Sequence, residues 1–236
     1  MPLPFFYKED LDGSKHVQLD EDTSKHIVQV LRMKTGEQIQ LTDGKGNLFI
    51  AGITDPGKRK CAVKILSATF QPPPDKSTMV AISLVKNTHR FEWFLEKAAE
   101  IGVSEVVPLI CFRTEKQHFR LERMRGILIS AMLQSQQAWL PALGEPVRFN
   151  DFIRYSKDKS ASKKFIAHCE EEESRVQLSS FTPFDSSIIL IGPEGDFTID
   201  EIELALQNDF IAVALGNTRL RTETAGIAAV TIISLT

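Results

Sequence analysis

Residues 188–197 read IILIGPEGDF, which is a run of four apolar residues followed by a loop with two glycines and a proline. A short run that is apolar on both faces is typical of a strand buried in a parallel sheet. Thr198 and Glu201 follow with the spacing of a capping box, which predicts a helix through about Gln207. Strand, tight loop and helix in succession indicate an open α/β sheet.

The same alternation extends to both sides of this stretch. Helical spacing of apolar residues predicts a helix over 91–101, ended by Gly102, and a small-residue helix from Thr222 to about Ser234 closes the chain. We therefore expect an α/β domain over residues 77–236. The other predicted buried strands are Met79–Val85, Val106–Cys111, Phe165–Cys169 and Ile211–Leu215.

Residues 1–70 have a different pattern, with short alternating runs separated by Gly and Asp. These runs predict strands at 37–42, 48–53 and 61–66, and one helix near 22–31. About 70 residues of short strands suggest a small barrel. Three consecutive prolines, Pro72–Pro74, cannot continue a ladder or a helix, so we place a linker at 71–76.

The composition excludes several classes of protein. The 236 residues are 42% hydrophobic and 25% charged, which rules out a disordered or fibrous chain, and the net charge of −3 argues against a bulk positive field that coats nucleic acid or membrane. No apolar run reaches the roughly 18–20 residues of a membrane span, and the first residues do not form a secretory signal, so we expect a cytoplasmic protein. Three widely spaced cysteines predict neither a disulfide framework nor a metal site.

The candidate site lies in the loops that follow the predicted strands, because open α/β sheets bind ligands at the carboxyl ends of their strands. The loops of interest follow Cys169, Ile191 and Leu215. Either GPEG or the LGNTRLRTETA stretch at 215–225 alone could be an ordinary turn or capped helix, but two such loops on successive strands favour a ligand. Without GxGxxG, GxxxxGK[ST] or GxSxG, a nicotinamide dehydrogenase, a P-loop hydrolase and an α/β-hydrolase are disfavoured. We interpret His168 as structural and the run Glu170–Glu173 as solvated.

IGPEGDF followed by LGNTRLRTETA resembles the bacterial 16S ribosomal RNA uridine-N3 methyltransferases, the RsmE family of the SPOUT class. HIVQVLRMK at 26–34 and EWFLEKAAEIG at 92–102 are similar to other blocks of that family, so the resemblance covers nearly the whole chain. The chain departs from the family pattern at Gln137, Asp196 and Thr218.

The resemblance implies a small PUA-like RNA-binding barrel followed by a SPOUT domain whose C-terminal part forms a trefoil knot. It implies S-adenosylmethionine as cofactor, 16S rRNA in the small ribosomal subunit as substrate, and a homodimer without metal or membrane. The knot loops, with Leu190, Leu215, Leu220 and Ile227 as apolar walls, would hold the cofactor. The implied cofactor-binding residues are His168, Cys169, Leu190, Ile191, Gly192, Pro193, Glu194, Gly195, Leu215, Gly216, Asn217, Leu220, Arg221 and Thr222.

Methyl transfer to N3 of uridine requires loss of the N3 proton, so a base or an anion-stabilising cation is needed. The resemblance makes Arg221 the candidate cation and leaves Glu194 and Glu223 open as proton acceptor. Two alternatives remain: another SPOUT RNA methyltransferase, or a catalytically silent RNA-binding assembly factor. The candidate phosphate contacts, each of which alone could be a solvated charge, are Arg32, Lys34, Lys86, Arg90, Lys97 and Arg113.

Overall fold

The computed structural model describes residues 3–11, 14–115, 118–157, 159, 163–169 and 176–235. The chain forms two compact units, one holding the residues up to Pro73 together with Met132–Leu140, the other holding Pro74–Ala131 and the chain from Pro141 onward. The sequence pattern had assigned 77–236 to the second domain without interruption. The structure differs there, because the segment 132–140 returns to the first unit.

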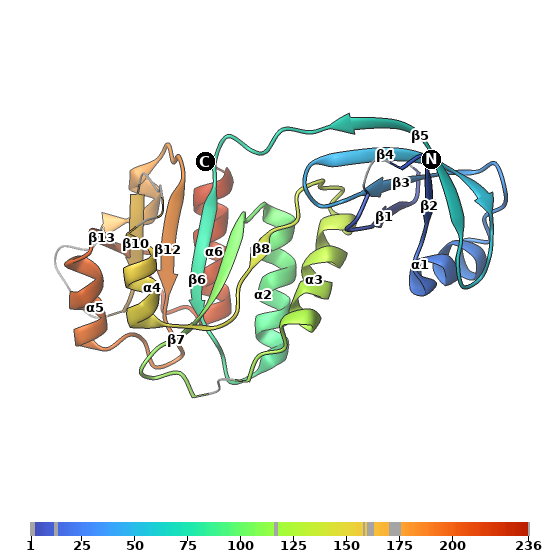
Figure 1. Ribbon diagram of the computed structural model, residues 1–236. Coiled ribbons are helices and arrows are strands. Elements are labelled where there is room, and N and C mark those ends of the chain that lie inside the picture. The colour runs from blue at the N-terminus through green and yellow to red at the C-terminus, as the bar shows by residue number, and fades with distance from the viewer. Residues whose placement is uncertain are drawn as a thin grey trace. The chain divides into compact units, whose positions relative to one another are not determined.

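The first unit is a curled five-stranded sheet in the order β1-β3-β4-β5-β2 (Figure 1). β1 runs parallel to β3 and the other pairs are antiparallel. A short helix, α1 (Glu21–Lys25), continues into a π-helical segment, His26–Val30, whose buried Ile27 joins the core where the sequence predicted a single helix. The strands are β1 (Phe5–Tyr7), β2 (His16–Gln18), β3 (Gln38–Thr42), β4 (Asn47–Asp55) and β5 (Ala62–Phe70).

The segment 132–140 is fixed to this sheet by backbone and side-chain bonds. The amide of Gly46 donates to the carbonyl of Ala138 at 3.0 Å, and the indole N–H of Trp139 donates to the carbonyl of Gln71 at 3.0 Å. Gly46 has a φ of 88°, and an added Cβ would lie 2.6 Å from Trp139. Only glycine fits both the backbone and the space there.

The second unit is built on a parallel sheet with the strand order β11-β13-β10-β12-β6-β7-β8, and β9 also pairs with β7. All described pairs of this sheet are parallel, so the carboxyl ends of its strands lie along one edge. The predicted apolar runs are confirmed as strands, with ends that differ by one or two residues. The strands are β6 (Thr78–Ser83), β7 (Glu105–Ile110), β8 (Ala142–Leu143), β9 (Val147–Arg148), β10 (Lys163–Ala167), β11 (Val176–Gln177), β12 (Ser187–Ile191) and β13 (Phe210–Ala214).

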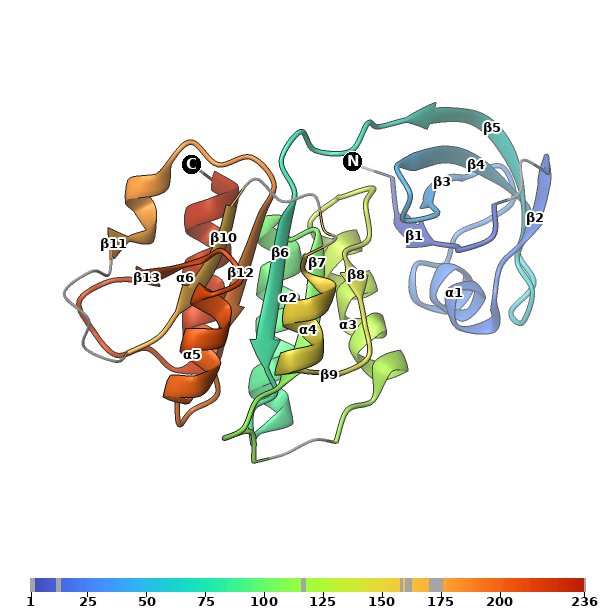
Figure 2. The same ribbon diagram turned by 60° about the vertical axis from the view of Figure 1, so that its left-hand side comes forward.

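Helices cover both faces of this sheet, α2 and α6 on one side and α4 and α5 on the other (Figures 1 and 2). The predicted stop of α2 is confirmed, since Gly102 caps it at a φ of 102°. The predicted capping box of α5 is confirmed between Thr198 and Glu201. The helices are α2 (Thr88–Ile101), α3 (Leu121–Gln134), α4 (Phe149–Tyr155), α5 (Ile199–Leu206) and α6 (Thr222–Leu235), with a 3-10 turn at Leu178–Phe181.

Small residues let α6 approach α2 and the sheet closely. A Cβ added to Gly226 would lie 2.6 Å from the ring of Phe94 and 2.9 Å from Ile82. The small residues of α6 thus serve packing within the chain. In the described part of the chain, no helix is long and apolar enough to cross a membrane. The trefoil knot stays a prediction.

Candidate functional site

Two adjoining hollows lie at the carboxyl ends of β10, β12 and β13 and at the start of α6. Their volumes are about 260 Å³ and 90 Å³, and they share Ala167, Cys169, Leu220 and Ala225. The larger is also lined by Ile191, Gly192, Pro193, Glu194, Asp196, Arg219, Arg221 and Thr222. The smaller is also lined by His168, Val213, Ala214, Leu215, Gly216 and Thr218.

The loop after β12, residues 192–197, is anchored from three sides. The hydroxyl of Thr222 donates to the carbonyl of Gly192 at 3.0 Å in the interior. The guanidinium of Arg113 donates to the carbonyl of Gly195 at 2.6 Å. The backbone amide of Lys86 donates to Oε1 of Glu194 at 3.3 Å. The loop is therefore held by α6, by the turn after β7 and by the turn after β6.

Asp196 ties this loop to the loop after β10. Its carboxylate Oδ2 accepts from the amide of Cys169 at 2.6 Å, and its Oδ1 accepts from the amide of Phe197 at 2.8 Å. Its φ is 64°, a left-handed conformation that Asp tolerates better than most residues with a side chain. Its own amide donates to the carbonyl of Pro193 at 2.9 Å.

The loop after β13 is held much less. Within the part of the chain that the structure describes, residues 216–220 make no hydrogen bond and no ion pair, and 216–219 are exposed. The carbonyl of Arg221 accepts from the amide of Ala225 at 2.7 Å, which begins α6. The exposed side chains of Arg219 and Arg221 line the larger hollow, so this loop supplies its positive charge.

The two candidate proton acceptors differ in their surroundings. Glu194 is exposed and lines the larger hollow. Glu223 is buried, and its Oε1 lies 3.7 Å from Nε of Arg90. Its Oε2 has no hydrogen-bond partner among the residues that the structure describes. Glu223 lines neither hollow. Of the two carboxylates, Glu194 is the one placed where a ligand could reach it.

Most of the predicted cofactor residues gather at the two hollows, but four do not. Leu190, named as an apolar wall, is fully buried in the sheet core. Gly195, Asn217 and Ile227 line neither hollow. The sequence did not indicate Asp196, Val213, Ala214 or Ala225 as lining residues. Asp196 and Ala225 lie inside the two loops that the sequence singled out, and Val213 and Ala214 lie at the end of a predicted strand.

The predicted RNA-contacting residues lie in separate places. Lys86 pairs with Glu115 at 2.9 Å, which raises the pKa of the lysine, and Arg113 is held against the 192–197 loop. Lys97 is bonded by Glu96 and Glu100, which raise its pKa, and it lies about 14 Å along α2 from the helix start near the strand ends. Arg32 and Lys34 are exposed in the first unit, and Arg32 has a φ of 55°.

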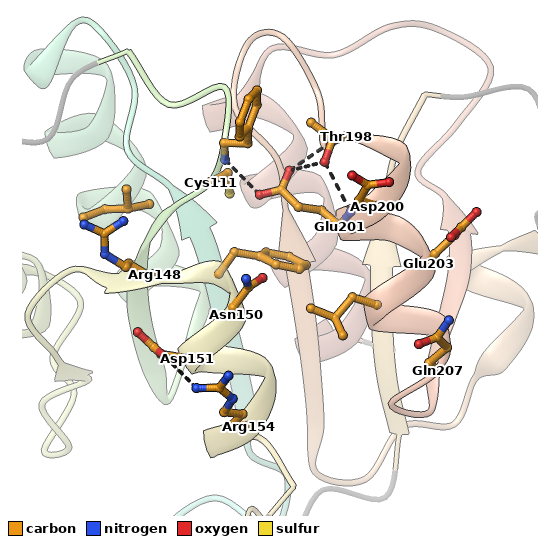
Figure 3. Close-up of a pocket in the computed structure, with 14 residues that line it drawn as sticks. Cys111, Arg148, Asn150, Asp151, Arg154, Thr198, Asp200, Glu201, Glu203 and Gln207 are labelled. Carbon is orange, nitrogen blue, oxygen red and sulfur yellow. Dashed lines mark hydrogen bonds and ion pairs between the residues drawn. The ribbon is translucent and has the colours of Figure 1, made fainter.

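A separate hollow of about 780 Å³, away from the two hollows at the strand ends, lies between α4 and α5 (Figure 3). Arg148 and Arg154 stand on its α4 side, and Asp200 and Glu203 on its α5 side. Glu201, at its upper end, is already used by the capping box and by the amide of Phe112. This hollow contains none of the predicted site residues.

The described cysteine, histidine and acidic side chains are not grouped as the ligands of a metal ion would be. Among the described residues, no group of three or more His, Cys, Asp or Glu could hold a metal ion. Burial raises the pKa of Cys111 to about 12, whereas Cys169 is exposed beside the hollows. The run Glu170–Glu173 lies outside the described residues.

A parallel sheet that gathers glycine-rich loops, arginines and carboxylates at the carboxyl ends of its strands defines a class of α/β protein that binds a small molecule at that edge. The family of RNA methyltransferase domains matches residues 72–234, and the family of RNA methyltransferase PUA domains matches residues 19–66. These two matches, together with the relative from Rickettsia conorii described next, show that the chain belongs to the ribosomal RNA small subunit methyltransferase E family.

Individual relatives agree with this assignment. The ribosomal RNA small subunit methyltransferase E of Rickettsia conorii is 30% identical over 223 residues, covering 93% of this chain and 90% of the relative. A solved structure described as a probable rRNA-methyltransferase from Porphyromonas gingivalis has a TM-score of 0.89 and 38% identity, covering 97% of this chain and 95% of that one. The Neisseria gonorrhoeae enzyme of the same family, solved bound to S-adenosylmethionine, has a TM-score of 0.80 and 31% identity, with coverage of 97% and 95%.

Proposed function

We propose that this chain transfers a methyl group from S-adenosylmethionine to N3 of one uridine of 16S rRNA in the small ribosomal subunit. The observation that carries the proposal is the meeting of the three strand-end loops around hollows lined by Arg221 and Glu194, in a chain of the methyltransferase E family. In this proposal the RNA-binding domain is residues 1–70 together with the returning segment 132–140, the linker is 71–76, and the remainder of 77–236 is the catalytic domain.

The residues that line the hollows suit the cofactor in their chemistry. The smaller one is walled mainly by apolar residues such as Val213, Leu215 and Leu220, which suits an adenine ring. The larger one carries Glu194 and Asp196 beside Arg219 and Arg221, which suits a group with an ammonium, a carboxylate and a sulfonium. Bound there, S-adenosylmethionine supplies an electrophilic methyl group.

The residues of the chain have to handle the N3 proton. Glu194 is positioned to accept it, because its carboxylate is exposed in the larger hollow. Arg221 is positioned to stabilise the negative charge that spreads over the uracil ring when the proton leaves. Glu223 is better suited to hold Arg90 than to reach the substrate.

Substrate capture completes the proposal. N3 lies on the pairing edge of uridine, so the target has to be unpaired or splayed out of its stack. Arg32 and Lys34 on the first unit, with Lys86, Arg90 and Arg113 near the strand ends, are the proposed phosphate contacts. We leave Lys97 out of this set, because two glutamates hold it farther along α2. The protein acts in the cytoplasm, where ribosomes assemble, and as a homodimer.

The test uses small ribosomal subunits from a strain lacking this protein. The purified chain is incubated with these subunits and S-adenosylmethionine labelled in its methyl group, and the RNA is then digested to nucleosides. We expect label in N3-methyluridine. Label in another nucleoside would replace the proposed specificity, and absence of label together with absence of cofactor binding would favour a silent RNA-binding factor. Sedimentation of the purified chain measures its oligomeric state.

A further inference from the structure

Asp196 is the side chain that joins the loop after β10 to the loop after β12. One of its oxygens accepts from Cys169 at 2.6 Å and the other from Phe197 at 2.8 Å. Its backbone adopts the left-handed conformation at a φ of 64° in order to do so. Cys169 lines both hollows, so this bond sets the shape of the wall that they share.

Asp196 is also one of the residues at the hollow that Glu194 lines. It is half-buried and lines that hollow together with Glu194, Arg219 and Arg221. The two arginines come from the exposed loop after β13, whereas Asp196 is fixed by its bonds to the two amides. Each carboxylate oxygen can accept a second hydrogen bond, so the carboxylate can still accept hydrogen bonds after it has bonded the two amides. Its negative charge is therefore both fixed in place and available to the hollow.

We propose that Asp196 is a positioning residue that locks the two loops together and, through its fixed charge, favours the cationic cofactor over its neutral product. The inference rests on the proposed function, because it presumes that S-adenosylmethionine binds in these hollows. Loss of the methyl group turns the sulfonium, which carries a positive charge, into the neutral thioether of S-adenosylhomocysteine. A fixed carboxylate attracts the former and not the latter, which would help the product to leave after each turnover.

Two substitutions remove the carboxylate without disturbing the backbone. Asn and Gly both tolerate the left-handed conformation, so Asp196→Asn and Asp196→Gly should fold as the parent chain does. The matched control is Asp200→Asn, which removes the same charge from an exposed position on α5 outside both hollows. Calorimetric titration of each protein gives its affinities for S-adenosylmethionine and for S-adenosylhomocysteine.

We expect Asp196→Asn to lower the ratio of the two affinities, cofactor over product, by about three- to tenfold, while Asp200→Asn leaves it unchanged. A purely structural role would weaken both ligands equally and keep the ratio. Hydrogen exchange of the free protein gives a second reading, since Asp196→Gly should speed exchange at the amide of Cys169. An unchanged ratio in Asp196→Asn would overturn the inference, whereas a parent chain that binds neither ligand would overturn the proposed function as well.

Discussion

The two loops that meet at the hollows are built in opposite ways. The loop after β12 is bonded to α6, to the turn after β7, to the turn after β6 and to the loop after β10. The loop after β13 has residues 216–219 exposed, and residues 216–220, all of which the structure describes, have no hydrogen bond. A site of this kind has one wall whose shape is set in advance and one wall that can follow its ligand.

The two loops also contribute side chains of opposite charge to the site. The anchored loop contributes the carboxylates Glu194 and Asp196, and the exposed loop and its junction with α6 contribute Arg219 and Arg221. Long arginine side chains on an exposed loop can reach a large, mobile substrate such as RNA, while fixed carboxylates suit a small cofactor. The comparison predicts that substitutions in the exposed loop lower the rate of methyl transfer, whereas substitutions that release the anchored loop lower stability and local protection from hydrogen exchange.

The largest effect is expected from the exposed loop. Arg221→Ala should lower the rate of methyl transfer by at least about 100-fold, because the charge that forms on uracil loses its partner. The midpoint of thermal unfolding should stay close to that of the parent chain, since the side chain is exposed. Single-turnover kinetics and thermal unfolding measure the two quantities. Near-normal turnover in this variant would remove Arg221 from the proposed chemistry.

The next effect concerns the helix on which the exposed loop ends. Gly226→Ala should lower the free energy of unfolding by about 1–3 kcal/mol, because the added methyl group would overlap Phe94 and Ile82. Gly126→Ala in α3 is the matched control, since nothing lies within 4 Å of a Cβ there, and it should be neutral or stabilising by up to about 1 kcal/mol. Urea unfolding measures both, and equal behaviour of the two variants would contradict close packing of α6.

A smaller effect is expected where the two walls are tied together. Thr222→Val keeps the shape of the side chain and removes the bond to the carbonyl of Gly192, which should cost about 1–2 kcal/mol of stability. Hydrogen exchange should then rise in the 192–197 loop and leave 216–220 as it was. If hydrogen exchange in the 192–197 loop did not change in this variant, the bond between Thr222 and Gly192 would not be what holds that loop in place.

The smallest effect is a change in thiol reactivity at the shared wall. Cys169 is exposed and should react with iodoacetamide, whereas Cys61 and Cys111 are buried and burial raises the pKa of both thiols, to about 12 for Cys111. The thiolate is the reactive form, so the two buried thiols should stay unmodified in the folded protein at neutral pH. S-adenosylmethionine should slow labelling of Cys169 several-fold. Mass spectrometry of the modified peptides checks this, and labelling unaffected by the cofactor would move the site elsewhere.

Much of the fold could be predicted because long apolar runs and caps are local signals. Strands β6, β7, β10, β12 and β13 were predicted in this way, as were the capping box of α5 and the stop of α2. Two-residue strands and the seven-residue α4 carry too little pattern to be recognised. The return of residues 132–140 to the first unit has no signal in composition, because it depends on a tertiary bond to Gly46.

The sequence predicted which loops form the site, but not which residues of those loops contact one another or line the hollows. Leu190 was expected as a wall from the family resemblance. Every residue of β12 is apolar or small and all five are buried, so the sequence pattern could not tell which of them face a hollow. The bond between Asp196 and Cys169 joins residues 27 apart, and nothing local indicates it. The burial of Glu223 beside Arg90 likewise depends on the packing of α6 against α2.

The segment that closes the first unit also imposes an order on synthesis. Trp139 and Ala138 leave the ribosome only after strands β6 and β7 and helices α2 and α3 have been made, so the first unit waits several seconds for its last segment at about 5–20 residues per second. During that interval the amide of Gly46 and the carbonyl of Gln71 lack the partners that Ala138 and Trp139 give them in the finished protein. A fragment that stops at Pro73 is therefore a permanently unfinished barrel, and a shortened chain meant to bind RNA has to carry residues 132–140 with it.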